Sequence, residues 1–221
     1  MAAPEAYFDP QTVAERSRAW RLLGSDGQFP ARYLTAVAAG QRRDRVWCTS
    51  VMWSHLRWLV GMARAALPAS DHDRPDAELV AAWFPDTSYV RIRCADHAGQ
   101  ALRFYARLHP AAAAGASATA VPDFEEVRWL ETVLVRQERA WDAFFSAPGL
   151  TVTTVDFGHF LRDPEECVQD VTAFLGLSPA PPTGPPAPAR STGTFDRRWR
   201  DRYRAVRDEL PATPGIRAQA R

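Results

Sequence analysis

The chain has 221 residues, 46% of them hydrophobic, and a formal net charge of +1, so it can form one sizeable core and lacks the basic field that attracts nucleic acid. All 27 of its basic residues are arginine, and neither lysine nor asparagine occurs. This composition excludes a phosphate-binding loop of the GxxxxGKS or GxxxxGKT type, a Schiff base and a lysine general base.

The N-terminal part of the chain predicts mostly helices. Apolar residues at helical spacing indicate one helix over 11–23 and a second over 31–39. The string RVWCTSVMW at 45–53 alternates β-forming and small residues, which predicts a buried strand that runs into a helix starting at Ser54. The string AELVAAWF predicts a short helix that ends before Pro85, because a residue that precedes proline disfavours the helical conformation.

The stretch SYVRIR at 88–93 predicts a strand that delivers arginines into a turn. A helix follows from about His97 to Leu108. A strand end that leads into a helix N-terminus is a common arrangement for holding a phosphate. Strands alternating with helices also favour an α/β layer with a parallel sheet.

The low-complexity run AAAAGASATA at 111–120 predicts a loop. Asp123 then caps the clearest helix of the chain, whose apolar residues keep helical spacing until Pro148 stops it. The string LTVTTVDF predicts a strand. The next helix has Asp163 as its N-cap and Pro164 at its first position.

A proline-rich segment, SPAPPTGPPAPA at 178–189, cannot form a regular hydrogen-bonded element and predicts an extended linker. The helix after it is dense in arginine and carries Trp199, Tyr203 and Val206 on one face. We therefore expect an α/β domain at 1–177, a proline-rich linker at 178–194, and an arginine-rich helix and tail at 195–221 that pack on the domain.

The three cysteines, Cys48, Cys94 and Cys167, lie far apart without CxxC spacing, so we expect no disulfide framework, no zinc site and no other metal. The sequence has no leader-like N-terminus and no long uncharged apolar stretch. We expect a cytoplasmic protein with a small-molecule substrate and with neither a membrane nor a nucleic-acid partner. Abundant alanine, arginine and proline are typical of a GC-rich bacterial genome.

Six strings occur in an order that we recognise: PEAYF, VWCTSVMW, YVRIRCADHAGQAL, RQERAWDAFF, TVDFGHFLRDP leading to VTAFLGLSP, and RRWRDRYR. Over almost its whole length the chain resembles the bacterial sulfotransferases typified by trehalose sulfotransferase. The resemblance implies a three-layer α/β fold with a parallel sheet, related to the P-loop kinases. It also implies transfer of a sulfuryl group from 3′-phosphoadenosine 5′-phosphosulfate (PAPS) to a hydroxyl.

In that family, three parts carry the chemistry. A glycine- and serine-rich loop after the first strand cradles the 5′-phosphosulfate, an arginine and a serine hold the 3′-phosphate, and a carboxylate takes the proton from the acceptor. Because the chain begins at Met1, close to Pro4 of the first string, we expect the first strand and its phosphosulfate loop to be absent.

The internal positions of the pattern are also changed. Ala3 stands where the family has the carboxylate, with Glu5 close enough to replace it. Cys94 or Ala95 stands in place of the arginine, and Arg103 in place of the serine. Two further positions that are polar or acidic in the family are Ser50 and Gly158 here. Each lost charge-assisted hydrogen bond costs about 1.5–3 kcal/mol. We therefore expect no cofactor, with PAPS bound only if the donor site still functions.

Arg93 and Arg103 could still form an anion pocket, because a strand-end arginine and one in the following helix can converge on one oxyanion. Alternatively, Arg91, Arg93 and Arg103 pair with surface carboxylates such as Asp96.

Arg198 and Arg202 in the last helix could bind the same anion, since the family's tail returns toward the site. The alternative is that the arginines of this helix only face solvent.

His97, beside the turn, and His159, after the second strand, are the candidate general bases, with Glu5 as a third. Histidines without a partner motif are more often structural. His55 and Trp53 follow the VMW string, which borders the acceptor site in the resembled family, so both are candidate substrate-binding residues. Aromatic residues at this spacing are more often part of the core.

Three functions remain open. The first is a repurposed protein of bacterial specialised metabolism that does not use PAPS and binds a sulfated or otherwise anionic small molecule, promoting sulfate displacement or elimination. The second is a genuine PAPS-dependent sulfotransferase. The third is a non-catalytic subunit of a partner enzyme. We expect a homo-oligomer or a hetero-oligomer in each case.

Overall fold

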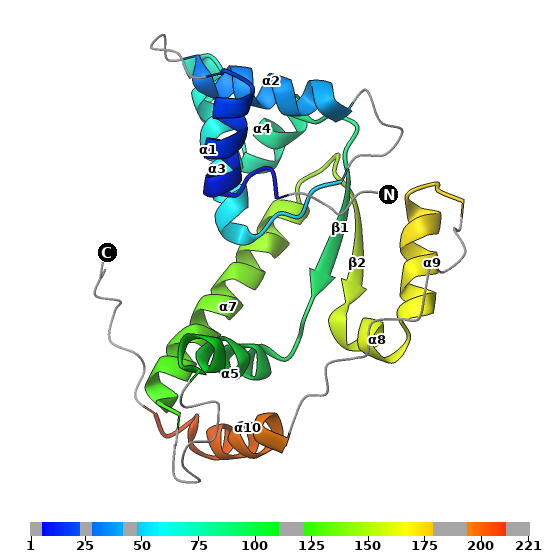
Figure 1. Ribbon diagram of the computed structural model, residues 1–221. Coiled ribbons are helices and arrows are strands. Elements are labelled where there is room, and N and C mark those ends of the chain that lie inside the picture. Colours follow the sequence, from blue (N-terminus) through cyan, green and yellow to red (C-terminus); the bar gives the residue numbers. More distant parts are fainter. Residues whose placement is uncertain (1–5, 23–27, 42–47, 111–121, 179–193, 211–221) are drawn as a thin grey trace. The chain divides into compact units, whose positions relative to one another are not determined.

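The computed structural model describes residues 6–22, 28–41, 48–110, 122–178 and 194–210 (Figure 1). The described elements, in chain order, are α1 (Pro10–Ala19), α2 (Phe29–Gln41), α3 (Trp53–Ala65), the short 3-10 helix η1 (Ala69–Asp71), α4 (Asp76–Trp83), β1 (Ser88–Arg93), α5 (His97–Leu108), α7 (Phe124–Phe145), β2 (Thr151–Asp156), α8 (Phe157–Arg162), α9 (Pro164–Phe174) and α10 (Thr194–Val206).

The described strands, β1 and β2, pair with each other in one small sheet. Their arrows point the same way in Figure 1, so the sheet is parallel. Parallel strands need a long crossover connection, and here α5 and α7 lie between the two strands in the chain. The prediction of a mixed α/β protein with a parallel sheet is confirmed at this level.

The chain forms two compact units. Unit 1 comprises residues up to Tyr89 together with 141–152, and unit 2 comprises 90–140 together with residues from Thr153 onward. The elements β1, α7 and β2 each begin in one unit and end in the other.

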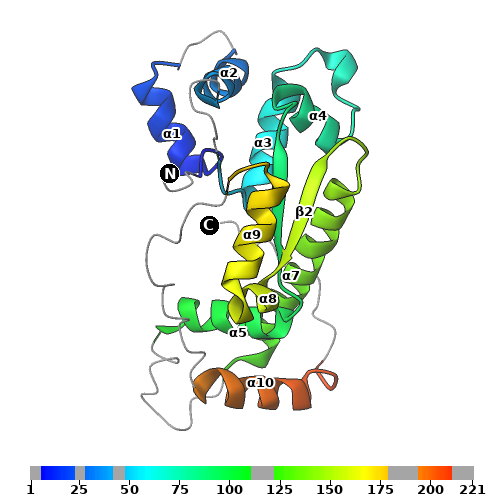
Figure 2. The ribbon, with the colours of Figure 1, turned by 90° about the vertical axis from the view of Figure 1, so that its right-hand side faces the viewer.

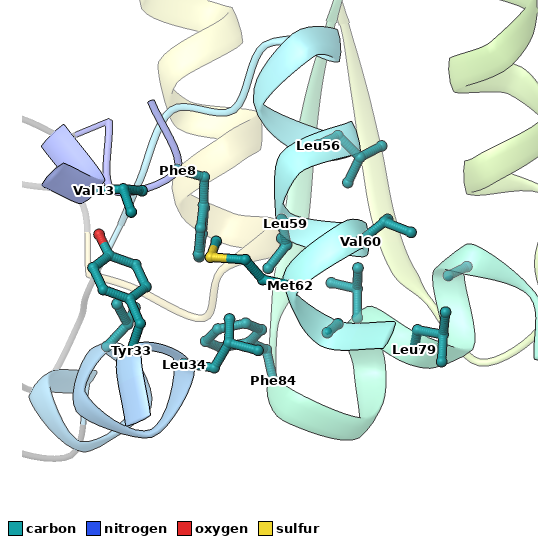
Figure 3. Packing of buried hydrophobic residues seen from close by; sticks show 14 of the residues in the cluster. Phe8, Val13, Tyr33, Leu34, Leu56, Leu59, Val60, Met62, Leu79 and Phe84 are labelled. Carbon is teal, nitrogen blue, oxygen red and sulfur yellow. The ribbon is translucent and has the colours of Figure 1, made fainter. Parts of the chain in front are cut away.

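The core of unit 1 is built mainly from α2, α3 and α4. Phe8, Leu34, Leu59, Met62 and Phe84 converge in its centre (Figure 3). The rings of Phe8 and Phe84 meet edge to face, with centroids 5.9 Å apart. Helix α3 supplies apolar residues at helical spacing, which explains why it packs against both of its neighbours.

The core of unit 2 is smaller and lies between α5, α7 and α10. Leu102 and Tyr105 of α5, Val127 of α7, and Trp199 and Tyr203 of α10 are buried in it. Both views place α10 alongside α5 (Figure 1; Figure 2). Burial of Trp199 and Tyr203 confirms that these residues define the inner face of the last helix.

A buried polar contact joins α10 to α7. The Tyr203 hydroxyl donates a hydrogen bond of 2.6 Å to Glu131 Oε2, and Arg207 Nε lies 3.4 Å from the same oxygen. Burial and this hydrogen bond raise the pKa of Tyr203. The otherwise costly burial of Glu131 is therefore compensated by a donor and a positive charge.

The predicted N-caps Asp123 and Asp163 are confirmed, and Asp96 is a third N-cap that the sequence analysis did not predict. The carboxylate of Asp96 accepts from the backbone N–H of Gly99, that of Asp123 from Glu125 and Glu126, and that of Asp163 from Glu166. These bonds satisfy amide groups that a helix start leaves without partners.

The prediction of a strand at 45–53 is wrong. Residues 45–47 lie outside the described part, while 48–52 form no strand beyond an isolated bridge at Thr49, and Trp53 already begins α3. Helix α1 also ends at Ala19, before the predicted end at Leu23, because Arg21 adopts a φ of 55° that no helix continues.

The predicted loop at 111–120 and nearly all of the proline-rich linker lie outside the described residues. Among the helices that the structure does describe, none combines the length and the apolar character needed to cross a membrane.

Candidate functional site

The carboxyl end of β1 carries two arginines that share one carboxylate. Side chains alternate along a strand, so Arg91 and Arg93 point to the same face. On that face Arg91 Nη2 lies 2.5 Å and Arg93 Nε 2.9 Å from Oε1 of Glu138, which belongs to α7. The intervening and preceding residues, Ile92 and Val90, point to the opposite face and are exposed.

This cluster holds one of its arginines at the surface. Two guanidinium groups face a single carboxylate, and Arg91 and Glu138 are mostly buried whereas the Arg93 side chain is 51% exposed. The ion pair with Glu138 orients the exposed Arg93. A guanidinium held in this way can bind an anion from solvent.

At the start of α5, an internal carboxylate occupies the position that suits an anion. Asp96 caps the helix, with Arg200 Nη2 3.4 Å from its Oδ2 and Arg204 Nη2 3.9 Å from its Oδ1. Helix N-termini attract negative charge. Asp96 supplies that charge from within the chain, and α10 supplies its counterions.

Gly99 permits this close arrangement. A Cβ atom at residue 99 would lie 2.1 Å from Asp96 Oδ2 and 3.1 Å from Arg200 Nη2. The first distance is far below van der Waals contact, so any side chain here would displace the cap.

The predicted base candidates of unit 2 differ in their surroundings. His97 follows Asp96 directly, and its Nε2 is buried without a hydrogen bond to any residue that the structure describes. His159 Nε2 lies 3.0 Å from Glu166 Oε2, and both side chains are substantially exposed. His97 is thus the candidate closer in the chain to Arg93, and His159 is a surface residue held by a carboxylate.

The other predicted arginines do not join the cluster. Arg103 is half-buried and Arg202 is exposed, and neither forms an ion pair within the described ranges. The alternative that Arg91, Arg93 and Arg103 pair with carboxylates holds for Arg91 and Arg93, although their partner is Glu138. Asp96 instead contacts two arginines of α10. The side chain of Arg198 and all of Glu5 lie outside the described part of the protein.

Trp53 and His55 belong to unit 1. The Trp53 ring meets Trp141 edge to face at 5.3 Å, as expected for a packing role. His55 is nearly buried, with Nε2 3.4 Å from Asp9 Oδ2. Asp9 also caps α1 through its Oδ1 atom, accepting from the N–H groups of Gln11 and Thr12, so one carboxylate serves a helix start and a histidine.

An open hollow of about 410 Å³ on α1 contains none of the predicted site residues; its lining is Ala6, Thr12, Glu15, Arg16 and Ala19. All three cysteines are unpaired. Across the described residues, no group of three or more His, Cys, Asp or Glu side chains is placed to hold a metal ion.

Sequence reasoning missed Glu138 and Asp9. Glu138 lies far along the chain from Arg91, so only the docking of α7 against β1 reveals its role. Asp9 was more accessible to prediction, because an aspartate before Pro10 is a typical helix start.

Comparison with known proteins agrees with the α/β architecture. The family model described as Stf0 sulphotransferase matches residues 2–206 of the chain. No curated protein matches it. Because the match covers most of the sequence, including both strands and the helices of both units, the chain belongs to the Stf0 sulphotransferase family.

Proposed function

We propose that this protein, a cytoplasmic member of bacterial specialised metabolism, binds a sulfated or otherwise anionic small molecule at the carboxyl end of β1 and does not use PAPS. The observation that carries the proposal is Arg93 at the end of β1, which is half exposed and is oriented by its ion pair with Glu138. We place it on the three-layer sulfotransferase fold implied by its family.

Two features argue against the nucleotide donor. Cys94, Ala95 and Arg103 stand where the resemblance expects the arginine and serine that hold a 3′-phosphate. In addition, Asp96 already uses the start of α5, so an incoming phosphate would meet a carboxylate there. The repulsion between a phosphate and a neighbouring carboxylate opposes nucleotide binding.

Because sulfate is a good leaving group, a sulfate ester bound at this position could undergo elimination instead of sulfuryl transfer. Arg93 would hold the sulfate oxygens, and a base would take a proton from the carbon next to the ester-bearing carbon. The electrons of that C–H bond form a C=C bond while the C–O bond breaks and sulfate leaves, so atoms and charge balance without a further reactant. His97 is our first candidate for the base, with His159 and Glu5 as alternatives.

Ordinary sulfuryl transfer from PAPS is the second candidate function, and the family match over 2–206 favours it. A role as a non-catalytic subunit is the third, favoured by the large apolar side chains that unit 2 exposes.

Calorimetric titration with 4-nitrophenyl sulfate at low ionic strength tests the proposal. We expect Arg93→Ala to weaken binding at least about tenfold, because one charge-assisted hydrogen bond contributes about 1.5–3 kcal/mol. Arg139→Ala is the matched control, since Arg139 is exposed on α7 beside Glu138.

Equal binding by wild type and Arg93→Ala, or no binding by wild type at millimolar ester, would contradict the proposal. Sulfate release from 2-phenylethyl sulfate, an alkyl ester with the adjacent C–H bond that elimination needs, followed by ion chromatography, then separates an enzyme from a binding protein.

A further inference from the structure

Unit 2 exposes apolar side chains on two separate helical surfaces. On α5, Phe104 is 40% and Leu108 60% exposed. On the α8–α9 segment, Leu161 is 50% and Val168 56% exposed. Large apolar side chains grouped in this way and flanked by polar residues are typical of surfaces that bind another macromolecule.

The α5 surface is basic. Arg107 lies one turn after Arg103, and Leu108 lies one turn after Phe104. Two arginines therefore lie beside two apolar residues on the side of α5 opposite the core. The helix contains no acidic residue. Neither Arg103 nor Arg107 forms an ion pair with a residue that the structure describes, so no described carboxylate neutralises their charges.

The α8–α9 surface is acidic. Helix α9 carries Glu165, Glu166 and Asp170 and no basic residue, and these carboxylates outnumber the one arginine of α8, Arg162. Glu165 lies one turn before Val168 on the outer side.

We propose that the α5 surface of one molecule, formed by Arg103, Phe104, Arg107 and Leu108, docks on the α8–α9 surface of a second copy, formed by Leu161, Glu165 and Val168. The two surfaces are opposite in charge and each carries two exposed apolar side chains, so they complement each other. Because they are different surfaces of the same chain, the contact is heterologous and joins copies head to tail.

The contact should be weak and sensitive to salt. A pair of helix faces buries less area than the interfaces of tight complexes, so dissociation constants in the micromolar range or above are expected. The charges at its rim are exposed, and salt screens exposed charges within about 10 Å at 0.1 M ionic strength. Neither surface includes Arg93, so this proposal stands independently of the proposed function.

Sedimentation of the full chain at about 100 µM, a concentration suited to weak interfaces, tests the proposal. Wild type should associate at low salt and dissociate at high salt. The variant Phe104→Asp/Leu108→Asp disables the α5 surface, and Leu161→Asp/Val168→Asp disables the α8–α9 surface. Each alone should associate at least about tenfold more weakly, but an equimolar mixture should form a 1:1 dimer and nothing larger, because each retains one intact surface.

Three controls accompany this measurement. Met52→Asp changes a similarly exposed residue of unit 1 and should leave association unaltered. Arg103→Ser/Arg107→Ser tests the same surface without adding negative charge, should either aspartate variant unfold. Vesicles containing phosphatidylserine test whether the basic α5 surface binds lipid instead.

A wild type that stays monomeric under these conditions overturns the proposal. So does a mixture that fails to form the 1:1 dimer, or wild type that binds the vesicles but not itself.

Discussion

Unit 1 is held together by apolar packing, whereas unit 2 depends on charged and polar contacts. Among the described residues, the core cluster of unit 1 has fifteen buried members and that of unit 2 has seven, of which Ala98 and Ala101 are small. Of the nine large hydrophobic residues exposed in the described chain, all but Met52 and Trp58 belong to unit 2. Unit 2 instead contains the clusters centred on Glu138, Glu131 and Asp96.

The difference concerns what stabilises each unit. Polar clusters specify geometry but add less stability than an equal area of packed apolar surface, since each buried charge must be desolvated. We therefore expect the described core of unit 1 to contribute more stability than that of unit 2. Four comparisons test this contrast.

The largest expected effect is in the core of unit 1. Leu79 is fully buried in α4, so Leu79→Ala should lower the free energy of unfolding by about 2–5 kcal/mol through lost contacts and a cavity. Leu161→Ala, on the exposed surface of α8, should change it by about 0.5 kcal/mol or less. Urea denaturation measures both. Equal losses would mean that unit 2 packs as tightly as unit 1.

A matched pair of tyrosines separates polar from apolar stabilisation. Tyr203→Phe removes the donor to the buried Glu131 and should cost about 1.5–3 kcal/mol. The Tyr89 hydroxyl is buried in unit 1 without a hydrogen bond to a described residue, so Tyr89→Phe should be close to neutral. Thermal unfolding compares the two variants. A neutral Tyr203→Phe would mean that the hydrogen bond to Glu131 does not stabilise unit 2.

Glycines of two helices provide the next comparison. Gly99→Ala forces the Asp96 cap away from α5 and should destabilise the protein by about 1–3 kcal/mol. At Gly61 of α3 a Cβ would meet nothing within 4 Å, so Gly61→Ala should stabilise by about 0.5–1 kcal/mol through helix propensity. Denaturation followed by circular dichroism measures the change in the free energy of unfolding for both variants. A stabilising Gly99→Ala would show that the cap tolerates displacement.

The smallest effect is a decline of stability in alkali. The pKa of Tyr203 is raised above its ordinary value of 10.0, so the folded state keeps the phenol proton to higher pH than the unfolded chain does. Its stabilisation is fully present below pH 10 and is lost as the pH rises further. Burial also raises the pKa of Tyr89.

Unfolding measured between pH 8 and 11 should therefore show a shallower decline in Tyr203→Phe than in wild type. A residual decline from Tyr89 should remain. An unchanged slope in Tyr203→Phe would contradict the raised pKa.

Local patterns predicted much of the fold but little of the site. The bounds of β1 and α5 are as expected, because alternation defines the strand and the Asp96 cap defines the helix start. Helix α8 was missed because it fits within the few residues between two capping aspartates, Asp156 and Asp163. The failed strand at 45–53 had suitable residue types but no long pairing partner in the described structure.

The site depends on how elements pack, which spacing alone cannot reveal. The contact of Arg91 and Arg93 with Glu138 needs one face of β1 to lie against α7. The contact of Asp96 with Arg200 likewise needs α10 to return to the start of α5. Sequence identified Arg93 as a candidate, and the structure adds the carboxylate that orients it.

Parallel calorimetric titrations of the wild-type protein with 4-nitrophenyl sulfate and with the bisphosphate product of PAPS test the central claim most directly. The account predicts binding of the ester that depends on Arg93 and no detectable binding of the nucleotide at millimolar concentration. Micromolar binding of the nucleotide, with no binding of the ester, would contradict the account and identify the protein as an ordinary PAPS-dependent sulfotransferase.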